Sequence, residues 1–169
     1  IGRIADVDRT GSKVVWLIID KSRASEWFRQ MTIDALVDTG PLVAMLNRSD
    51  SQHTACVEAL NLIRTPLVTT WPVLTEAAYL LRQRPDLVQR LIRSTAEGFL
   101  RVAVLSETDA SAMAEIMELY VDQHFQLADV SLMHLADRDG IETVFTLDRR
   151  DFSVYRTQQG HQLHLIPGL

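Results

Sequence analysis

From residue 31 onward, short apolar runs alternate with longer segments whose apolar residues recur every three to four positions. The short runs lie at residues 33–37, 67–70, 101–105 and 143–147. Apolar runs of this length are typical of strands that are buried on both sides, and the intervening segments have the periodicity of amphipathic helices. This order predicts an α/β fold with a mainly parallel sheet covered on both faces, to which residues 161–166 add a fifth strand at the edge.

Local signals place the helices. Pro41 predicts the first position of a helix after the first strand, and Pro72 opens another after the second, over residues 72–81. Gly140 is placed to end a helix that begins at Asp129. Further helices are expected at residues 52–64, 87–96 and 107–120. In the last of these, the periodicity predicts an inward face made of Ala110, Met113, Ala114 and Met117.

Residues 1–30 differ from the rest of the chain. They carry six basic and four acidic groups, whereas residues 31–169 carry eleven and eighteen, and both lysines, Lys13 and Lys21, lie in the first segment. We therefore expect residues 1–30 to be an N-terminal extension of unknown role and residues 31–169 to be the compact domain. Limited proteolysis tests this boundary, because the core should survive cutting near Gln30.

Composition narrows the class of protein. Of the 169 residues, 47% are apolar and 23% are charged, which is ordinary for one globular domain. The single cysteine, Cys56, excludes an internal disulfide framework, and we expect it to be an inert core residue. No apolar run approaches the roughly 20 residues that span a bilayer, and Asp6, Asp8 and Asp20 interrupt any secretory signal. We expect a cytoplasmic protein.

Four acidic residues follow the predicted strands. Asp38 and Asp148 come directly after the first and fourth strands, Glu76 lies in the helix after the second, and Asp129 opens a later helix. The functional crevice of an open parallel sheet lies at the carboxyl ends of its strands, so we expect all four at one edge. Structural explanations exist too, since Asp38 and Asp129 suit helix N-caps and Asp148 suits a turn. Glu76 lies among apolar neighbours, where a carboxylate is costly unless it is paired or metal-bound.

Four clustered carboxylates need something to offset their negative charge. Divalent cations do this, and carboxylate oxygens with water select hard ions such as Mg²⁺ or Mn²⁺. Two such ions would neutralise the four acids and suit phosphodiester cleavage, in which a water is activated and a leaving oxygen is stabilised. Mechanisms that need a catalytic lysine are excluded for residues 31–169, which contain none.

Several other catalytic classes do not fit. A haloacid-dehalogenase-type phosphotransferase needs a second aspartate two residues after the first, where Gly40 stands, and a receiver domain needs a lysine. A dinucleotide-binding fold needs a glycine-rich first turn, and neither an H-E-x-x-H pair nor a G-x-S-x-G elbow is present. We expect His161 and His164 at the surface or in edge-strand packing, and Trp71 in packing rather than base stacking.

The residues around the four acids resemble a known family. The matching segments are Val37-Asp38-Thr39-Gly40-Pro41-Leu42, a mid-domain helix with Glu76, Leu127-Ala128-Asp129-Val130-Ser131-Leu132 and Thr146-Leu147-Asp148-Arg149-Arg150-Asp151-Phe152. Together they resemble the PIN-domain ribonucleases, most closely the toxins of VapC type. The ordered set of segments across residues 31–169 carries the resemblance, rather than any one motif.

This resemblance implies an α/β/α sandwich with a five-stranded parallel sheet. It also implies Mg²⁺- or Mn²⁺-dependent endoribonuclease activity on structured RNA such as tRNA or rRNA, common dimerisation, and neutralisation by a cognate antitoxin. The implied catalytic residues and metal ligands are Asp38, Glu76, Asp129 and Asp148. Thr39 would hydrogen-bond near the metal-bound water, and Asp151 would support the cluster from outside.

An acidic domain that binds RNA needs basic groups near its crevice. Arg48, Arg149 and Arg150 lie beside the predicted crevice and are candidates for holding phosphates, although Arg149 suits a loop ion pair with Asp151 equally well. The apolar helix at residues 74–81 is a candidate dimer face. Two other functions stay open: a PIN-like module that binds RNA or protein without turnover, and a housekeeping RNA-processing nuclease. Stabilisation by Mn²⁺ would favour a working acidic site over the binding module.

Overall fold

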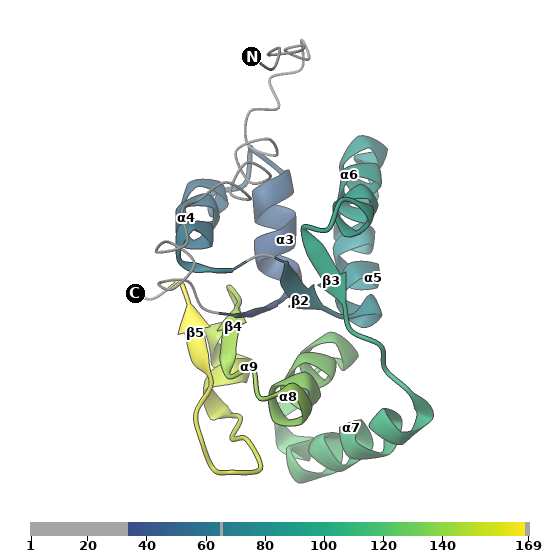
Figure 1. The fold of residues 1–169 in the computed structure, drawn as a ribbon, viewed down its shortest axis with the longest axis vertical. Coiled ribbons are helices and arrows are strands. Elements are labelled where there is room, and N and C mark those ends of the chain that lie inside the picture. The colour runs from purple at the N-terminus through teal and green to yellow at the C-terminus, as the bar shows by residue number, and fades with distance from the viewer. Residues whose placement is uncertain (1–33, 65, 168–169) are drawn as a thin grey trace, which may run out of the picture. The chain divides into compact units, whose positions relative to one another are not determined.

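The computed structural model describes residues 34–64 and 66–167 of the chain. Five strands form one sheet in the order β3-β2-β1-β4-β5 (Figure 1), and each neighbouring pair is parallel. The strands are β1 (Leu36–Val37), β2 (Leu67–Thr69), β3 (Leu100–Val102), β4 (Thr143–Phe145) and β5 (His164–Ile166). The predicted parallel sheet and its fifth strand at the edge are confirmed. The predicted extension at residues 1–30 lies outside the described residues.

The strands are shorter than the apolar runs that predict them, because the backbone leaves the sheet where side-chain hydrogen bonds fix the following turn. β1 ends at Val37, since Asp38 caps the following helix. β4 ends at Phe145, since the hydroxyl of the next residue, Thr146, bonds to groups outside the sheet. β3 begins one residue earlier than predicted, at Leu100, which pairs with β2.

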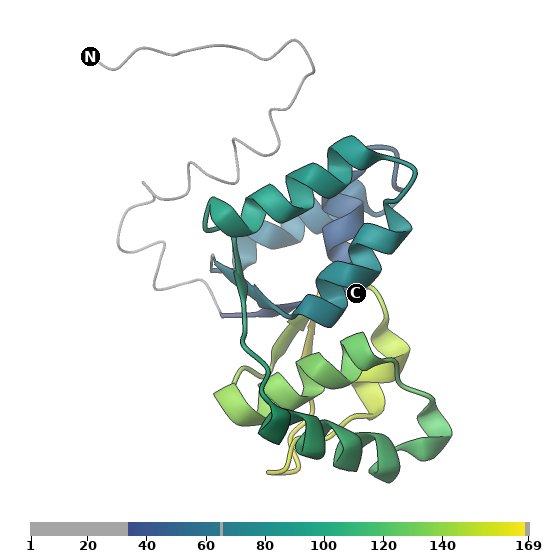
Figure 2. The same ribbon diagram turned by 90° about the vertical axis from the view of Figure 1, so that its right-hand side faces the viewer.

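Helices cover both faces of the sheet (Figures 1 and 2). One face carries α3 (Thr39–Leu46), α4 (His53–Ala59), α5 (Trp71–Leu80) and α6 (Pro85–Ala96). The other carries α7 (Glu107–Leu119) and α8 (Leu127–Asp139), with α9 (Arg149–Val154) packed beside α8. Two short 3₁₀ helices follow α4 and α7, at Leu60–Leu62 and Val121–Gln123. This arrangement is the predicted α/β/α sandwich.

The core lies between these layers. The central strand β1 and its neighbour β4 contribute fully buried residues, namely Leu36, Val37, Val144 and Phe145. The inward face of α4 and the turn after it is buried as well, through Cys56, Ala59, Leu60 and Ile63. Burial raises the pKa of the Cys56 thiol to about 11, which leaves it protonated at neutral pH, in keeping with an inert core position. None of the helices in the described ranges is long and apolar enough to cross a membrane.

The first helix begins earlier than predicted. α3 starts at Thr39, so Pro41 is its third residue rather than its first. The reason is Asp38, whose side chain accepts the Thr39 backbone N–H and thereby caps the helix ahead of the proline. Thr39 is thus fixed in the first turn, directly beside the acid.

Two later helices also differ from the prediction. α8 begins at Leu127 with Gln126 as its N-cap, so the prediction that Asp129 opens this helix is wrong by two residues. Nothing in the apolar pattern predicts α9, whose N-cap is Asp148, a residue expected in an open turn. Gly140, with a φ of 67°, ends α8 as predicted.

The predicted inward face of α7 is largely wrong. Met113 is buried, but Ala110, Ala114 and Met117 are exposed, and Asp109 is buried instead. The buried face differs from the predicted one because the Asp109 carboxylate bonds to His134 and Arg138 of α8. The apolar periodicity contains no information on such polar contacts.

Candidate functional site

Asp38 lies at the centre of the carboxyl edge of the sheet, directly after β1. The residue is only 5% exposed. One carboxylate oxygen accepts the backbone N–H of Thr39 at 2.6 Å, and the other accepts the Thr146 hydroxyl at 2.7 Å. Both oxygens are therefore held in place by neighbours on either side, α3 and the end of β4.

Thr39 joins Asp38 to Glu76. The Thr39 hydroxyl donates to the Glu76 carboxylate at 2.8 Å and lies 3.4 Å from the Val73 carbonyl, so it links the first turn of α3 to α5. Glu76 is half-buried on the side of α5 that faces α3. Thr39, which the sequence predicted as a site residue, thus lies between Asp38 and Glu76 and orients the Glu76 carboxylate.

Asp148 and Asp151 lie on the other side of Asp38. The Asp148 carboxylate is exposed and accepts the backbone N–H groups of Arg150 and Asp151 at 3.1 and 3.4 Å, which caps α9. The Asp148 backbone N–H donates to the Thr146 hydroxyl at 2.9 Å. Because that same hydroxyl donates to Asp38, Thr146 ties the two acids together. Burial, and then the charge of Asp148, raises the pKa of Asp151.

Asp129 approaches from α8. Its carboxylate is half-buried and accepts the backbone N–H of Gln126 at 2.9 Å, which closes a capping box at the start of the helix. The pKa of Asp129 is raised to about 7, chiefly by burial, and the hydrogen bond from the Gln126 N–H opposes this rise. The negative charges of Asp38, Asp151 and Glu76 also contribute to this raised value.

These carboxylates form one electrostatic cluster. Burial raises the pKa of Asp38, the hydrogen bonds from Thr146 and Thr39 lower it, and the charges of Glu76 and Asp148 raise it again. Neighbouring acids therefore disfavour the charged forms of Asp38 and Asp129, as like charges in a poorly solvated place do. The fold therefore concentrates negative charge at one edge, where these acids raise one another's pKa.

The donor atoms suit a hard cation. They are carboxylate oxygens and a threonine hydroxyl, which Mg²⁺ and Mn²⁺ prefer over nitrogen or sulfur ligands. As the side chains lie, however, no three His, Cys, Asp or Glu side chains of the described residues are close enough together to hold an ion. Glu76 is instead turned to Thr39, and Asp38 to Thr39 and Thr146. The residues fit a metal by chemistry, and their carboxylates would have to turn inward to bind one.

Comparison with known proteins identifies the fold family. The model of the PIN domain matches residues 35–157. The chain belongs to the PIN-domain family. Ribonuclease VapC26 of Mycobacterium tuberculosis (strain ATCC 25618 / H37Rv) is 31% identical over 134 residues, which cover 78% of this chain and 99% of that protein. The predicted resemblance to the VapC-type ribonucleases is confirmed.

A solved structure supports the fold of this PIN domain. The crystal structure of Mycobacterium tuberculosis VapC20, described as a sarcin-ricin loop cleaving toxin, superposes with a TM-score of 0.64. The match covers 70% of this chain and 92% of VapC20. Because the identity is 18%, the match supports the fold alone.

The three candidate arginines of the PIN domain differ in their surroundings. Arg48, after the end of α3, and Arg150, in α9, are both exposed. The Arg150 Nε lies 3.7 Å from a carboxylate oxygen of Asp151. Arg149 is half-buried and donates to the Pro167 carbonyl at 2.7 Å, so part of its guanidinium holds the chain after β5. The loop ion pair with Asp151 is therefore made by Arg150 rather than by Arg149.

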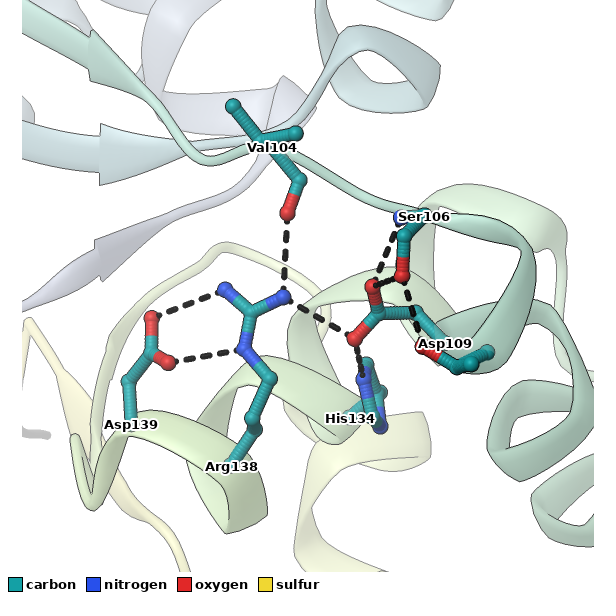
Figure 3. Close-up of polar contacts among 7 residues, drawn as sticks. Val104, Ser106, Asp109, His134, Arg138 and Asp139 are labelled. Atoms are coloured by element: carbon teal, nitrogen blue, oxygen red, sulfur yellow. Dashed lines mark hydrogen bonds and ion pairs between the residues drawn. The ribbon is translucent and has the colours of Figure 1, made fainter.

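A second polar cluster, which was not predicted from the sequence, lies farther along α8 (Figure 3). The Asp109 carboxylate accepts hydrogen bonds from the Ser106 hydroxyl at 2.5 Å and backbone N–H at 2.6 Å, from His134 at 2.6 Å, and from Arg138 at 2.9 Å. Arg138 also donates to the Val104 carbonyl at 3.0 Å. These bonds hold the pKa of Asp109 well below its usual range, those from Ser106 and His134 most strongly.

This cluster fastens α7 to α8. Only two residues of α7 are buried, Asp109 and Met113, so the polar contacts carry much of its attachment. The capping-box pattern of Ser106 followed by Asp109 is a signal in the sequence for the start of α7, and it places the acid. The partners His134 and Arg138 lie 25 and 29 residues away, and no local pattern indicates them.

Proposed function

We propose that this PIN domain is a divalent-metal-dependent endoribonuclease of the toxin type, which cleaves structured RNA. The observation that carries the proposal is Asp38, which is held at both carboxylate oxygens and whose pKa is raised by burial and then by the charges of Glu76 and Asp148. A fold that keeps such acids together bears a repulsion that a bound cation relieves. The likeness to Ribonuclease VapC26 over nearly its whole length supports the activity.

The roles follow from the contacts. One or two Mg²⁺ or Mn²⁺ ions would be held by the four acids, Asp38, Glu76, Asp129 and Asp148. Ions held by these residues would supply the charge that lowers the pKa of an attacking water and that offsets the charge on the leaving oxygen of the phosphodiester. Thr39 orients the Glu76 carboxylate, and Asp151 adds negative charge beside Asp148 from outside the cluster.

RNA binding would use basic and aromatic groups at the same edge. Arg48 and Arg150 are exposed and can bind phosphates of the RNA. Arg149 would bind a phosphate through the guanidinium nitrogens that are not bonded to Pro167. Trp71 is 58% exposed at the first position of α5, so the prediction that it is a packing residue is wrong. An exposed indole there suits stacking on an unpaired base, which supports a substrate with single-stranded loops.

The remaining partners are those of a toxin. We expect a cognate antitoxin that places a basic side chain toward the acids, a homodimer, and action in the cytoplasm on tRNA or rRNA. Within the predicted dimer face at residues 74–81, Leu74 and Leu81 are buried in the core, whereas Tyr79 and Leu80 are exposed at 63% and 52%. Tyr79 and Leu80 are therefore the residues of this helix that a second copy can contact.

Cleavage by the purified full chain tests the proposal. With Mg²⁺ or Mn²⁺ present, it should cut a tRNA or an rRNA stem-loop at few positions and leave 5′-phosphate and 3′-hydroxyl ends. EDTA should stop the reaction, and Ca²⁺ should bind while supporting little turnover, because its looser coordination places the water poorly. Glu76→Gln and Asp129→Asn should each lower the rate by orders of magnitude. Asp122→Asn, at an exposed acid in the 3₁₀ helix after α7, is the matched control and should leave it unchanged.

Three outcomes contradict parts of this proposal. Cleavage that resists EDTA and leaves 2′,3′-cyclic phosphates would overturn the metal mechanism, because that route uses the ribose 2′-hydroxyl and an acid–base pair. A folded, Mn²⁺-bound protein that cuts none of the RNAs would indicate a binding module. Activity in vitro without growth arrest on expression in bacteria would indicate a housekeeping nuclease.

A further inference from the structure

Two hydroxyls meet in the core between α5 and α8. Thr70 and Ser131 are both completely buried, and their side-chain oxygens lie 2.7 Å apart. The Ser131 hydroxyl also donates to the Ala128 carbonyl at 2.6 Å. Since serine has a single hydroxyl proton, the Thr70 hydroxyl must be the donor to Ser131. The bonds therefore run in one direction, from Thr70 through Ser131 to the Ala128 carbonyl, and we call this chain of bonds the hydroxyl relay.

Both ends of the hydroxyl relay adjoin residues of the acidic cluster. The Ala128 carbonyl belongs to the peptide group whose N–H is that of Asp129. Thr70 is the residue directly before α5, the helix that carries Glu76. α5 and α8 pack against each other, and the charge of Glu76 contributes to the raised pKa of Asp129. The relay thus joins the backbone at one acid to the start of the helix that bears another.

Thr70 does not use its hydroxyl in the way its position favours. A threonine at an N-cap usually accepts a backbone N–H from the first turn of its own helix. At the start of α5, the Thr70 side chain makes no such bond, and the second residue of the helix, Pro72, has no N–H to offer one. The Thr70 hydroxyl is turned to Ser131 on α8. The Thr70 hydroxyl therefore serves a contact between two helices rather than a cap of its own helix.

Hydroxyls connect the other acids too. Thr39 joins Asp38 to Glu76, and Thr146 joins Asp38 to Asp148. Asp129 differs, because the side-chain hydrogen bond that the structure gives it is to Gln126 of its own turn. Its position relative to the other acids therefore depends on how α8 is held against α5, and the hydroxyl relay is the polar contact at that point.

We propose that Thr70 and Ser131 are positioning residues, which set the separation between Asp129 and Glu76 and thereby the affinity of the site for a divalent cation. This inference rests on the proposed function, since it assigns these acids to one metal site. Without the relay, the peptide group at Asp129 is no longer fixed to the start of α5, although α8 and α5 still lie against each other. Outer groups that orient metal ligands typically contribute roughly 10–100-fold in affinity.

Mn²⁺ titration of the full chain by calorimetry tests the inference, with urea unfolding in EDTA measured alongside. Thr70→Val and Ser131→Ala should each lower Mn²⁺ affinity by about tenfold. The double variant should lose no more than the weaker-binding single variant, because both changes break the same relay. Thr70→Ser keeps the hydroxyl and should stay within about twofold of the parent protein. Ser131→Ala serves as the second variant if Thr70→Val does not fold.

Thr157→Val is the matched control. Thr157 is a buried threonine in the loop that leads to β5, and its hydroxyl accepts the backbone N–H of His161 at 3.0 Å. This variant should lose stability in urea but keep Mn²⁺ affinity. Stability losses in Thr70→Val and Ser131→Ala with unchanged Mn²⁺ affinity would show a merely structural role and overturn the inference.

Further outcomes separate the inference from the proposed function. Additive losses of affinity in the double variant would mean that the two hydroxyls act separately, which also contradicts the relay. A parent protein that binds Mn²⁺ but cuts no RNA would overturn the proposed function alone, and the affinities of the variants would still decide the role of the relay. A parent protein that binds no Mn²⁺ would overturn both.

Discussion

Replacing Asp38 by asparagine should separate two effects of the acidic cluster, namely the stability that its charges cost in the absence of metal and the affinity for Mn²⁺ that they provide. The asparagine side chain can keep both contacts of the parent residue: its oxygen accepts the Thr39 N–H, and its amide donates to the Thr146 hydroxyl. The Thr146 proton is then free to turn toward the Asp148 carbonyl, 3.4 Å away. The substitution therefore removes a charge with little change of shape.

The sign of the stability change follows from the raised pKa of Asp38. Because the folded state holds this proton more tightly than the unfolded chain, ionisation of Asp38 costs stability as the pH rises through its folded pKa. An asparagine side chain has no such proton to lose. Without metal at about pH 7.5, Asp38→Asn should therefore be as stable as the parent protein or more stable, and the difference should vanish in acid, below the unfolded pKa.

Metal should reverse this order. A ligand at about 100 times its dissociation constant stabilises a protein by about 2.7 kcal/mol. For a chain of this size, each kcal/mol shifts the melting temperature by about 2–4 °C, so saturating Mn²⁺ should raise that of the parent protein by about 5–10 °C. Asp38→Asn should show a rise of less than about 2 °C, because it lacks a charged ligand.

Thermal unfolding with and without Mn²⁺, together with a calorimetric titration, measures both effects. Asp122→Asn serves as the control and should respond to Mn²⁺ as the parent protein does. Unchanged Mn²⁺ affinity in Asp38→Asn would remove Asp38 from the metal site. A large loss of stability in the absence of metal would refute the argument that burying this charge is costly.

Three other predictions concern the titration of Asp129 and the cluster on α7. Mn²⁺ affinity should fall about tenfold for each pH unit below 7, because a proton competes with the metal for Asp129, whose pKa is raised to about 7. Calorimetric titrations at about pH 5.5–8 that show no such slope would contradict this prediction. The same raised pKa means that Asp129 favours the metal-free fold below about pH 4 and less so as the pH rises through 7, so Asp129→Asn should flatten the dependence of stability on pH. Asp109→Asn should destabilise the fold in urea more than Asp122→Asn does, because it weakens contacts to His134 and Arg138 that hold α7. Equal midpoints for these two variants would show that apolar contacts alone hold α7.

The order of elements and the position of the acids could be predicted because both depend on local pattern. Short apolar runs between amphipathic segments require a covered parallel sheet, and Asp38 and Asp148 directly follow two of those runs. Acids in such places meet at one edge of the sheet whatever the details of the loops. The family resemblance then supplied roles that the pattern alone left open.

The hydroxyl contacts could not be predicted, because their partners are distant in the sequence. Thr146 bonds to Asp38 across 108 positions and Thr70 meets Ser131 across 61. A threonine at the end of a strand has many local uses, and nothing in its neighbours selects one of them. Asp109 was missed for the same reason: periodicity favours Ala110 as an inward residue until Arg138 is known to lie opposite.

The separation of Asp38 and Thr146 along the chain has a consequence for synthesis of the protein. β1 lies between β2 and β4, so one side of this central strand stays unpaired until residues 143–145 have been made. A growing chain that stops short of Thr146 lacks both the hydroxyl that holds Asp38 and the acid that follows at position 148. Such distant pairings also form late in folding. A ribosome that has not yet translated Asp148 therefore carries a chain with an incomplete acidic cluster, and nuclease activity should begin only after synthesis has passed this residue.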